Sequence, residues 1–378
     1  MGCDTYWMDT PCIPTDHVLR REAISNINKV FARSRATLIC DRDLMEIDLE
    51  EGEVSVELCE SILVTAIVCD WNVRAWTFLE AFRARQSIYL LCKHNRVVSL
   101  KECVGKVHRE GSLDVAVLLL AAPHLMPRVY RDDDGGISAD TYPLTRHILK
   151  KSEPLFKGFL TVENSGMLLS HRPASRPGDD IVIWSLLLDE KVHENAIDFW
   201  RSREGHSIHT SFLVSTAPRL NIWRFGWAPS SPRLFSDISA NSKTRSMGFS
   251  DVSSKMALIS AEGLRAKWLI HDVGTLKQTV SKLSFAGKLI SVSNTKTICD
   301  KFLQGYRWGW LLRPLLANTP FDEVPALNRE DFSQVLIVVC ATNDPPDDNT
   351  AWEWRGVHEW DSKEPLPKFK YSREILLV

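Results

Sequence analysis

The chain has 378 residues, 44 % of them apolar and 25 % charged, which is ordinary globular composition and enough length for two or three domains with packed cores. Lys and Arg number 46 and Asp and Glu number 48, giving a formal net charge of −2. This balance removes the broad attraction on which nucleic-acid binders rely, and the apolar stretches are shorter than the roughly 20 residues of a membrane span. We therefore expect neither nucleic acid nor a membrane span.

Residues 1–104 are predicted to alternate between strands and helices, which is typical of a parallel α/β sheet. The first element is the end of a short strand at Tyr6–Asp9, and Thr15 or Asp16 begins the helix that follows. Apolar residues of this helix recur at helical spacing with polar ones such as Asn28 between them. The later elements are a strand at Ala36–Cys40, helices at Val56–Val68 and Arg74–Arg83, and strands at Ser87–Cys92 and Val97–Leu100.

Residues 105–160 are predicted to form a helical and loop connection. Leu113–Ala122 has the composition of a helix and Arg131–Gly136 that of a turn. The turn contains three consecutive aspartates, but the alternate ligand spacing and closing Glu of an EF-hand are absent. We interpret it as a solvated loop.

Residues 161–378 are predicted to form an α+β region with strands near the C-terminus. Ser175–Asp180 indicates a turn or a helix start, and the apolar run Ile181–Leu188 after it is either a buried strand or a buried helix. Val335–Cys340 is expected to be a strand that pairs with residues 352–360.

Residues 352–360 alternate in a pattern that predicts a strand with one buried face. That face carries Trp352, Trp354, His358 and Trp360, and charged residues lie between them. Indole rings in such a row either stack on sugars or face a core. We expect the core.

The nine cysteines are an odd number, and none forms a C-x-x-C pair. Cys40, Cys69, Cys92 and Cys340 lie in apolar runs, so we expect buried thiols in a reducing, cytoplasmic protein, without disulfides or zinc. His206 and His209 are three residues apart, but no carboxylate or cysteine at ligand spacing completes a metal site. We expect no metal and no bound cofactor.

Two clusters in the first 104 residues are candidates for function. The first is Tyr6-Trp7-Met8-Asp9-Thr10-Pro11-Cys12-Ile13, which places a carboxylate and a thiol at the end of the predicted strand, where α/β sheets bind ligands. A nucleophilic Cys12 requires a base, and His17 is near in sequence. Nothing else supports this pair, so we interpret Cys12 as a packing residue.

The second cluster lies on the helix predicted at Arg74–Arg83. Its apolar face consists of Ala75, Leu79 and Phe82, and the adjoining flank of Trp76, Thr77, Glu80 and Arg83. One interpretation is a surface ion pair between Glu80 and Arg83, which contributes little to stability. The other places Glu80 in a crevice with Asp9, beside an aromatic wall, where its carboxylate stabilises positive charge that develops on a ribose. The residues alone favour the ion pair.

At these two clusters the sequence resembles the fungal heterokaryon-incompatibility (HET) domain. The family's Y-x-W-I-D-x-L-C-I-x-Q block is matched by Tyr6, Trp7, Met8, Asp9, Cys12 and Ile13. Its R-x-W-T-x-Q-E block is matched by Arg74, Trp76, Thr77 and Glu80. Phrases that resemble the tails of HET proteins are Arg176–Leu187, Ser215–Leu220 and Gly226–Pro229. The family's opening A-L-S-Y-x-W-G block is absent from this chain.

The resemblance implies a partial, N-terminally truncated HET domain over residues 1–104, with an incomplete TIR-like, flavodoxin-like parallel sheet, and a HET-type tail over 161–378. It implies a role in fungal nonself recognition and programmed cell death, through incompatibility partners or self-association, or else a degenerate copy. HET domains are similar in outline to TIR domains, some of which cleave NAD. The spacing of Trp76 and Glu80 is like that of the TIR W-C-x-x-E pattern.

Two alternatives follow. One is a TIR-like NAD glycohydrolase that uses Glu80, with NAD as its substrate; the other is a non-catalytic interaction module in residues 161–378. Fold similarity alone does not establish chemistry. We therefore expect an interaction protein rather than an enzyme.

Overall fold

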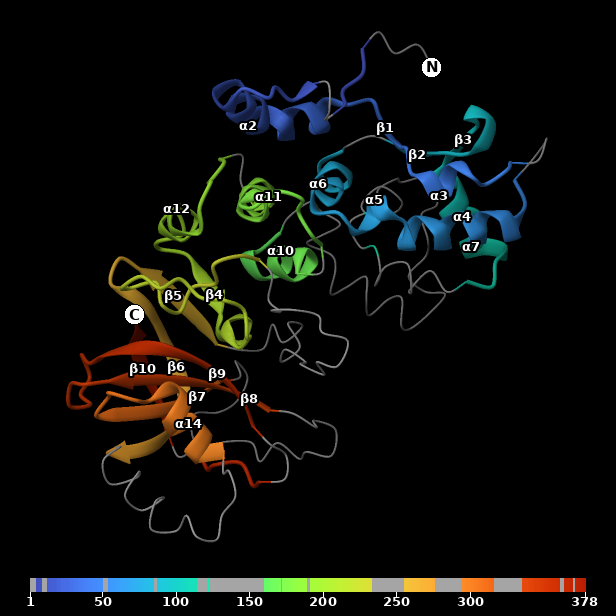
Figure 1. The fold of residues 1–378 in the computed structure, drawn as a ribbon. Helices are drawn as coiled ribbons and strands as arrows, with labels where there is room; N and C mark the ends of the chain where they lie inside the picture. Colours follow the sequence, from blue (N-terminus) through green and yellow to red (C-terminus); the bar gives the residue numbers. More distant parts are fainter. Residues whose placement is uncertain are drawn as a thin grey trace. The chain divides into compact units, whose positions relative to one another are not determined.

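A computed structural model describes residues 5–8, 12–49, 54–84, 87–113, 122, 125, 160–170, 172–188, 191–232, 255–275, 294–315, 335–360, 364–369 and 371–378. The chain forms two compact units (Figure 1). The first consists of Met1–Thr161 and His171–His193, and the second of Val162–Ser170 and Glu194–Val378. This division differs from sequence-based boundaries at 104 and 161, because residues 171–193 pack with the N-terminal elements.

The first unit combines helices with a small sheet. Its described elements are α2 (His17–Arg33), β1 (Ala36–Ile39), α3 (Arg42–Met45), α4 (Val56–Val68), α5 (Asp70–Val73), α6 (Ala75–Arg83), β2 (Ser87–Leu91), η1 (Lys93–Asn95), β3 (Val97–Ser99), α7 (Leu100–Glu110) and α11 (Asp179–Leu188). The helices and strands predicted for residues 17–100 are therefore present. Asp16 begins α2, because its Oδ1 accepts hydrogen bonds from the Val18 and Leu19 amides at 3.0 Å.

The sheet of the first unit has the order β1-β2-β3. Strand β1 runs parallel to β2, but β3 is antiparallel to β2, so the predicted parallel sheet is a mixed sheet in the described part of the chain. One face, with Ile39 and Leu90, is buried against α4 and α7. On the opposite face Leu38 is 48 % and Val97 50 % exposed, whereas a doubly wound parallel sheet is covered on both faces.

The N-terminal strand predicted at Tyr6–Asp9 is not observed. Residues 5–8 have no regular secondary structure, and Asp9 lies outside the described residues. Trp7 instead packs edge-on against Phe31 of α2, with ring centroids 5.2 Å apart. The predictions for 114–121 and 131–136 also lie outside the described residues.

The second unit contains helices and a larger sheet. Its described elements are α10 (Val162–Leu169), α12 (Ala196–Arg201), β4 (Ser207–His209), η3 (Thr210–Leu213), β5 (Met256–Ser260), β6 (Gly263–Thr275), α14 (Asn294–Phe302), β7 (Trp308–Pro314), β8 (Val335–Thr342), β9 (Ala351–Trp360) and β10 (Tyr371–Leu377). The expected strands near the C-terminus are present, and β8 and β9 pair as predicted.

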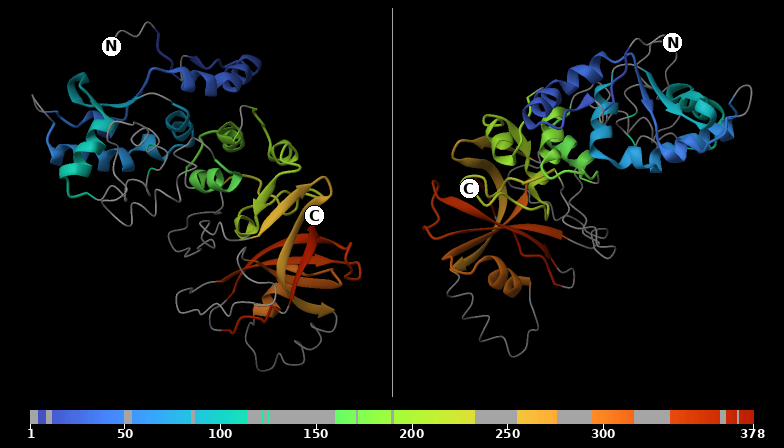
Figure 2. Two further views of the ribbon diagram at one scale, coloured as in Figure 1. Left: turned by 180° about the vertical axis from the view of Figure 1, so that it is seen from behind. Right: turned by 45° about the horizontal axis from the view of Figure 1, so that its top comes forward.

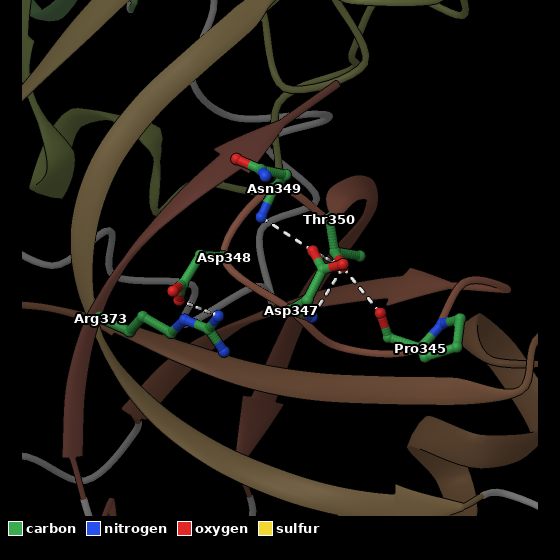
Figure 3. Close-up of polar contacts among 6 residues, drawn as sticks. All are labelled: Pro345, Asp347, Asp348, Asn349, Thr350 and Arg373. Carbon is green, nitrogen blue, oxygen red and sulfur yellow. Dashed lines mark hydrogen bonds and ion pairs between the residues drawn. The ribbon is translucent and has the colours of Figure 1, made fainter.

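Strands β6 to β10 close into a barrel. The seven-stranded order is β10-β9-β8-β7-β6-β5-β4, and β10 also pairs with β6, from Tyr371 opposite Ile270 to Leu377 opposite Leu264. Figure 2 shows these strands, coloured yellow to red, crossing one another in two views. The loop between β8 and β9 is tied to β10 by an ion pair between Asp348 and Arg373 (Figure 3). Closure leaves β6 and β10 without a free edge at this seam.

Strand β9 changes its buried face at a β-bulge. Cys340 pairs with Trp354 but Val339 pairs with Gly356, so Arg355 is the extra residue. Gly356 has a φ of +148°, and a Cβ there would lie 2.6 Å from the Phe302 ring of α14, so the bulge requires glycine.

The bulge overturns the prediction that four residues of β9 share one face. Trp352 and Trp354 face the barrel interior, where Trp352 stacks on Trp310 of β7 with ring centroids 3.7 Å apart. His358 and Trp360 lie on the outer side, where Trp360 packs with Ile298 of α14. The expected core location of these indoles is confirmed: Trp352, Trp354 and Trp360 are buried.

Among the described residues, every helix is too short or too polar to cross a lipid bilayer.

Candidate functional site

Helix α6 carries the second motif block, and Thr77 fixes its first turn. The Thr77 hydroxyl is buried, lies 2.9 Å from the Arg74 carbonyl oxygen and also hydrogen-bonds the Trp71 carbonyl of α5. Arg74 itself is exposed and caps the helix through its backbone position only. The predicted apolar face of Ala75, Leu79 and Phe82 is buried. Thr77 therefore has a structural role between two short helices.

Trp76 meets a carboxylate from a distant part of the chain. Its indole Nε1 donates a hydrogen bond of 2.7 Å to Oδ2 of Asp179, the first residue of α11. The other carboxylate oxygen lies 4.0 Å from the Arg20 guanidinium of α2, and both of these side chains are largely shielded from solvent. A carboxylate at a helix N-terminus also interacts favourably with the helix dipole. Asp179 thus joins α2, α6 and α11.

The C-terminal end of α11 is held by the same two helices. The Arg83 Nη2 of α6 donates to the Leu186 and Leu187 carbonyl oxygens at 2.6 and 2.9 Å. Asn28 of α2 donates to the Leu186 carbonyl at 2.8 Å. Carbonyl groups in the last turn of a helix have no partner within the helix, so these side chains satisfy them. We name the contacts at both ends, made by Arg20, Asn28, Trp76, Arg83 and Asp179, the α11 clamp.

The segment before α11 is tied to α6 as well. The Ala75 amide donates to the Pro173 carbonyl at 3.2 Å, and the Arg172 guanidinium lies 5.1 Å from the centre of the Phe78 ring. Burial lowers the pKa of Arg172 to about 10. These contacts fix the path of the chain into the clamp.

Glu80 is half-buried on α6, on the same helix as Trp76. Asp9, its expected partner across a crevice, lies outside the described residues, so the pairing of the two carboxylates stays a prediction. The flank of α6, for which one interpretation was a surface ion pair between Glu80 and Arg83, is partly used for packing, because Trp76 and Arg83 both bind α11.

Tyr6, Met8 and Cys12 of the first motif block are exposed. Tyr6 is 82 % exposed and Ile13 is half-buried. Cys12 is exposed, so its interpretation as a packing residue is wrong; its Sγ lies 3.4 Å from the Met8 amide. No hydrogen bond between Cys12 and His17 is found in the described part of this segment. The structure therefore gives no support to a Cys12–His17 pair.

The other cysteines are mostly as expected. Cys69, Cys92 and Cys340 are buried, whereas Cys40 is exposed, contrary to the prediction. Burial raises the pKa of Cys69, Cys92 and Cys340, and their thiolates are disfavoured. Cys59 and Cys103 contact one another in the first core, where burial also raises the pKa of Cys103. Thiols with this burial are unreactive.

His206 and His209 each have a hydrogen-bond partner of their own. His206 Nδ1 lies 3.2 Å from the Arg203 carbonyl, and the His209 amide donates to Glu163 at 2.7 Å. In the part of the chain that the structure describes, no three side chains of His, Cys, Asp or Glu form a potential metal site.

Sequence reasoning missed the partners of the motif. Asp179 and Arg20 were outside the predicted cluster, and Asn28, a polar residue in the middle of a helix, is buried. A signal was present at Asp179, which stands at the start of an apolar run in one of the phrases that resemble HET tails. The clamp contains no adjacent nucleophile and base, so its geometry positions a helix rather than a reacting group.

No protein-family model matches the chain, and no curated protein or solved structure shows significant similarity to it.

Proposed function

We propose that this chain is a HET-type protein that acts in fungal nonself recognition and cell-death signalling through contacts with other proteins. The observation that carries the proposal is the hydrogen bond between Trp76 and Asp179. Trp76 belongs to the R-x-W-T block and Asp179 to a phrase that resembles HET tails, and they are 103 residues apart in sequence. Two sequence features that suggest the same family thus meet at one point.

The clamp also supports a signalling role on physical grounds. Helix α11 is apolar on all sides, and its seven residues Ile181 to Leu187 are buried. Such a helix is stable only while its neighbours cover it. Because a few polar contacts at its two ends align it with α2 and α6, a partner that competes for one of them changes the surface of this unit.

Expression in a fungal cell tests this function. We expect the wild-type protein to arrest growth, and Trp76→Ala or Asp179→Ala to weaken the arrest at equal protein level. Asp70→Ala, an exposed acidic residue in the first turn of α5, is the matched control and should behave like the wild type. Unchanged toxicity in both clamp variants rejects a role for the motif. A wild-type protein without any effect identifies a degenerate copy.

A TIR-like NAD glycohydrolase is the second candidate, favoured by the half-buried position of Glu80 on the helix that carries Trp76. The assay is release of nicotinamide from NAD by the purified chain. We expect Glu80→Gln to abolish it, with Glu57→Gln, in the first turn of α4, as the control. Absence of release in the wild type removes this candidate, and release that persists in Glu80→Gln removes the assignment to Glu80.

An interaction module in the second unit is the third candidate. The closed β6–β10 barrel, which α14 covers, favours this candidate. A closed sheet has no free edge at its seam and has its own core, so it can stay folded when the first unit unfolds. Limited proteolysis should then give a stable C-terminal fragment that begins near residue 161 while residues 1–104 are degraded. Equal loss of both units contradicts this candidate.

A further inference from the structure

The three-stranded sheet of the first unit exposes apolar side chains on one face. Leu38 of β1 lies opposite Tyr89 of β2, and Leu91 of β2 lies opposite Val97 of β3, so these four residues share that face. Leu38 and Val97 are exposed, and Tyr89 and Leu91 are half-buried. A sheet with one solvated face normally carries polar residues there. We name these four residues the sheet face.

Helix α4 also exposes apolar side chains on the side away from its core. Ile62 and Ala66 of this helix are buried in the core of the first unit. Val64 and Val68 are 46 % and 69 % exposed, and because they are four residues apart they lie on one stripe, on the opposite side of the helix. Surface helices normally carry polar residues on that side. We name Val64, Val68 and the exposed Glu57, one further turn and more along the same side, the α4 stripe.

The sheet face and the α4 stripe lie on opposite sides of the first unit. The buried sides of the sheet and of α4 belong to one core, which contains Ile39 and Leu90 of the strands and Ile62 and Ala66 of the helix. The two exposed surfaces therefore point away from this core in opposite directions. They cannot meet within one chain, but the α4 stripe of one copy can cover the sheet face of the next.

The charges around the two surfaces have opposite signs. Helix α4 contains two glutamates and neither Lys nor Arg, and Glu57 is exposed on the stripe. Strands β1, β2 and β3 contain no charged residue, but the exposed Arg35 directly precedes β1. Lys93 and Arg96 lie in the turn between β2 and β3, and Lys93 is 3.9 Å from Asp48. Pairing of stripe with sheet face brings opposite charges together, whereas pairing of like surfaces brings like charges together.

We propose that copies of this chain associate head to tail, with the α4 stripe of one copy packed on the sheet face of the next. The helix then covers the second face of the sheet, as helices do in α/β proteins. Because the two surfaces of such a contact differ, each dimer keeps one free surface of each kind and further copies can add. The contact shares no residue with the α11 clamp and does not depend on the role in cell death.

Sedimentation velocity of the full chain over a range of concentrations tests this contact. We expect the mean sedimentation coefficient of the wild type to rise with concentration. Leu38→Glu places a charge on the sheet face and Val68→Glu places one on the α4 stripe, so each variant alone should stay monomeric. Val18→Glu, at a valine of α2 that is 71 % exposed, is the matched control and should associate like the wild type.

An equimolar mixture of the two defective variants gives the sharpest result. The Leu38→Glu chain keeps its α4 stripe and the Val68→Glu chain keeps its sheet face, so we expect the mixture to form dimers and no larger species. A mixture that stays monomeric overturns the proposal. Loss of association in only one of the two variants also overturns it, because that result indicates pairing of like surfaces.

A wild-type chain that is monomeric at every concentration overturns the proposal too, and it leaves the two surfaces to other proteins. The substituted side chains are exposed, so the unfolding temperatures of the variants should stay close to that of the wild type. Should Leu38→Glu fail to fold, Val97→Glu on β3 replaces it, because Val97 belongs to the same face. Association of Val97→Glu at the wild-type level contradicts a role for the sheet face.

Discussion

The two units are stabilised in different ways. In the first, α11 is aligned by a few polar side chains at its ends, from helices that are distant in sequence. In the second, backbone pairing closes the barrel and stacked tryptophans fill it. In the first unit a few side chains therefore determine how α11 packs. In the second unit many backbone hydrogen bonds hold the strands together. Single substitutions of polar side chains should therefore lower the stability of the first unit. Substitutions that change the volume of a buried side chain should lower the stability of the second.

The largest effect is expected from Trp310→Ala in the barrel. Trp310 is 2 % exposed and stacks on Trp352, so its removal leaves a cavity that costs about 3–5 kcal/mol. Calorimetry of the full chain should show a lower transition temperature for the second unit. Trp223→Ala, at a position 62 % exposed, is the control and should change stability by less than about 0.5 kcal/mol. Equal effects of the two changes contradict a tightly packed barrel.

A smaller effect is expected from Arg83→Met in the clamp. It removes the donor to the Leu186 and Leu187 carbonyls and should destabilise the first unit by about 1–3 kcal/mol. Hydrogen exchange should become faster in α11. Arg33→Met, an exposed arginine in the last turn of α2, is the control. Unchanged exchange in α11 after Arg83→Met shows that the C-terminal contacts do not hold the helix.

The smallest effect is a pH dependence of the second unit. His358 donates from Nε2 to Asn294 Oδ1 at 2.9 Å, an assignment fixed by Asn294 Nδ2, which donates to Glu364 at 3.0 Å. Burial lowers the pKa of His358, the Lys301 charge lowers it further, and Glu364 opposes this.

Because the folded pKa lies below the unfolded value of about 6.5, the unfolded chain binds more protons in acid. The contribution of neutral His358 to stability is fully present above this unfolded pKa, and it declines as the pH falls through and below that value. His358→Gln should flatten this decline between pH 7 and 5, and His271→Gln, in β6, should not. Identical pH profiles of the wild type and His358→Gln contradict the assignment.

The sequence predicted the helices and strands better than it predicted the contacts between residues that are distant in sequence. Helices α2, α4 and α6 were predictable because their apolar residues recur at helical spacing. The run Ile181–Leu188 was not, because a helix that is buried on all sides has no polar face to reveal its period. The period of β9 was correct, but one inserted residue, Arg355, moved half of the strand to the other face.

The candidate site was predictable only in part. Trp76 and Thr77 were found from their motif, whereas Asp179 is 103 residues from Trp76, and no local pattern indicates such a pairing. Cys40 was predicted to be buried from its apolar neighbours, and Cys12 was interpreted as a packing residue, yet both are exposed. The hydrophobicity of neighbouring residues does not show whether another part of the chain covers a side chain.

The central claim is that the contact between Trp76 and Asp179 joins the R-x-W-T block to the phrase Arg176–Leu187, and a double-mutant cycle of unfolding free energies tests it most directly. The variants are Trp76→Phe, Asp179→Ala and both together, with Trp76→Phe and Asp70→Ala as the control cycle. We predict a coupling energy of about 1–2 kcal/mol for Trp76 with Asp179 and additivity for the control. If the Trp76 and Asp179 effects instead add within about 0.3 kcal/mol, the block and the phrase do not interact and the account fails.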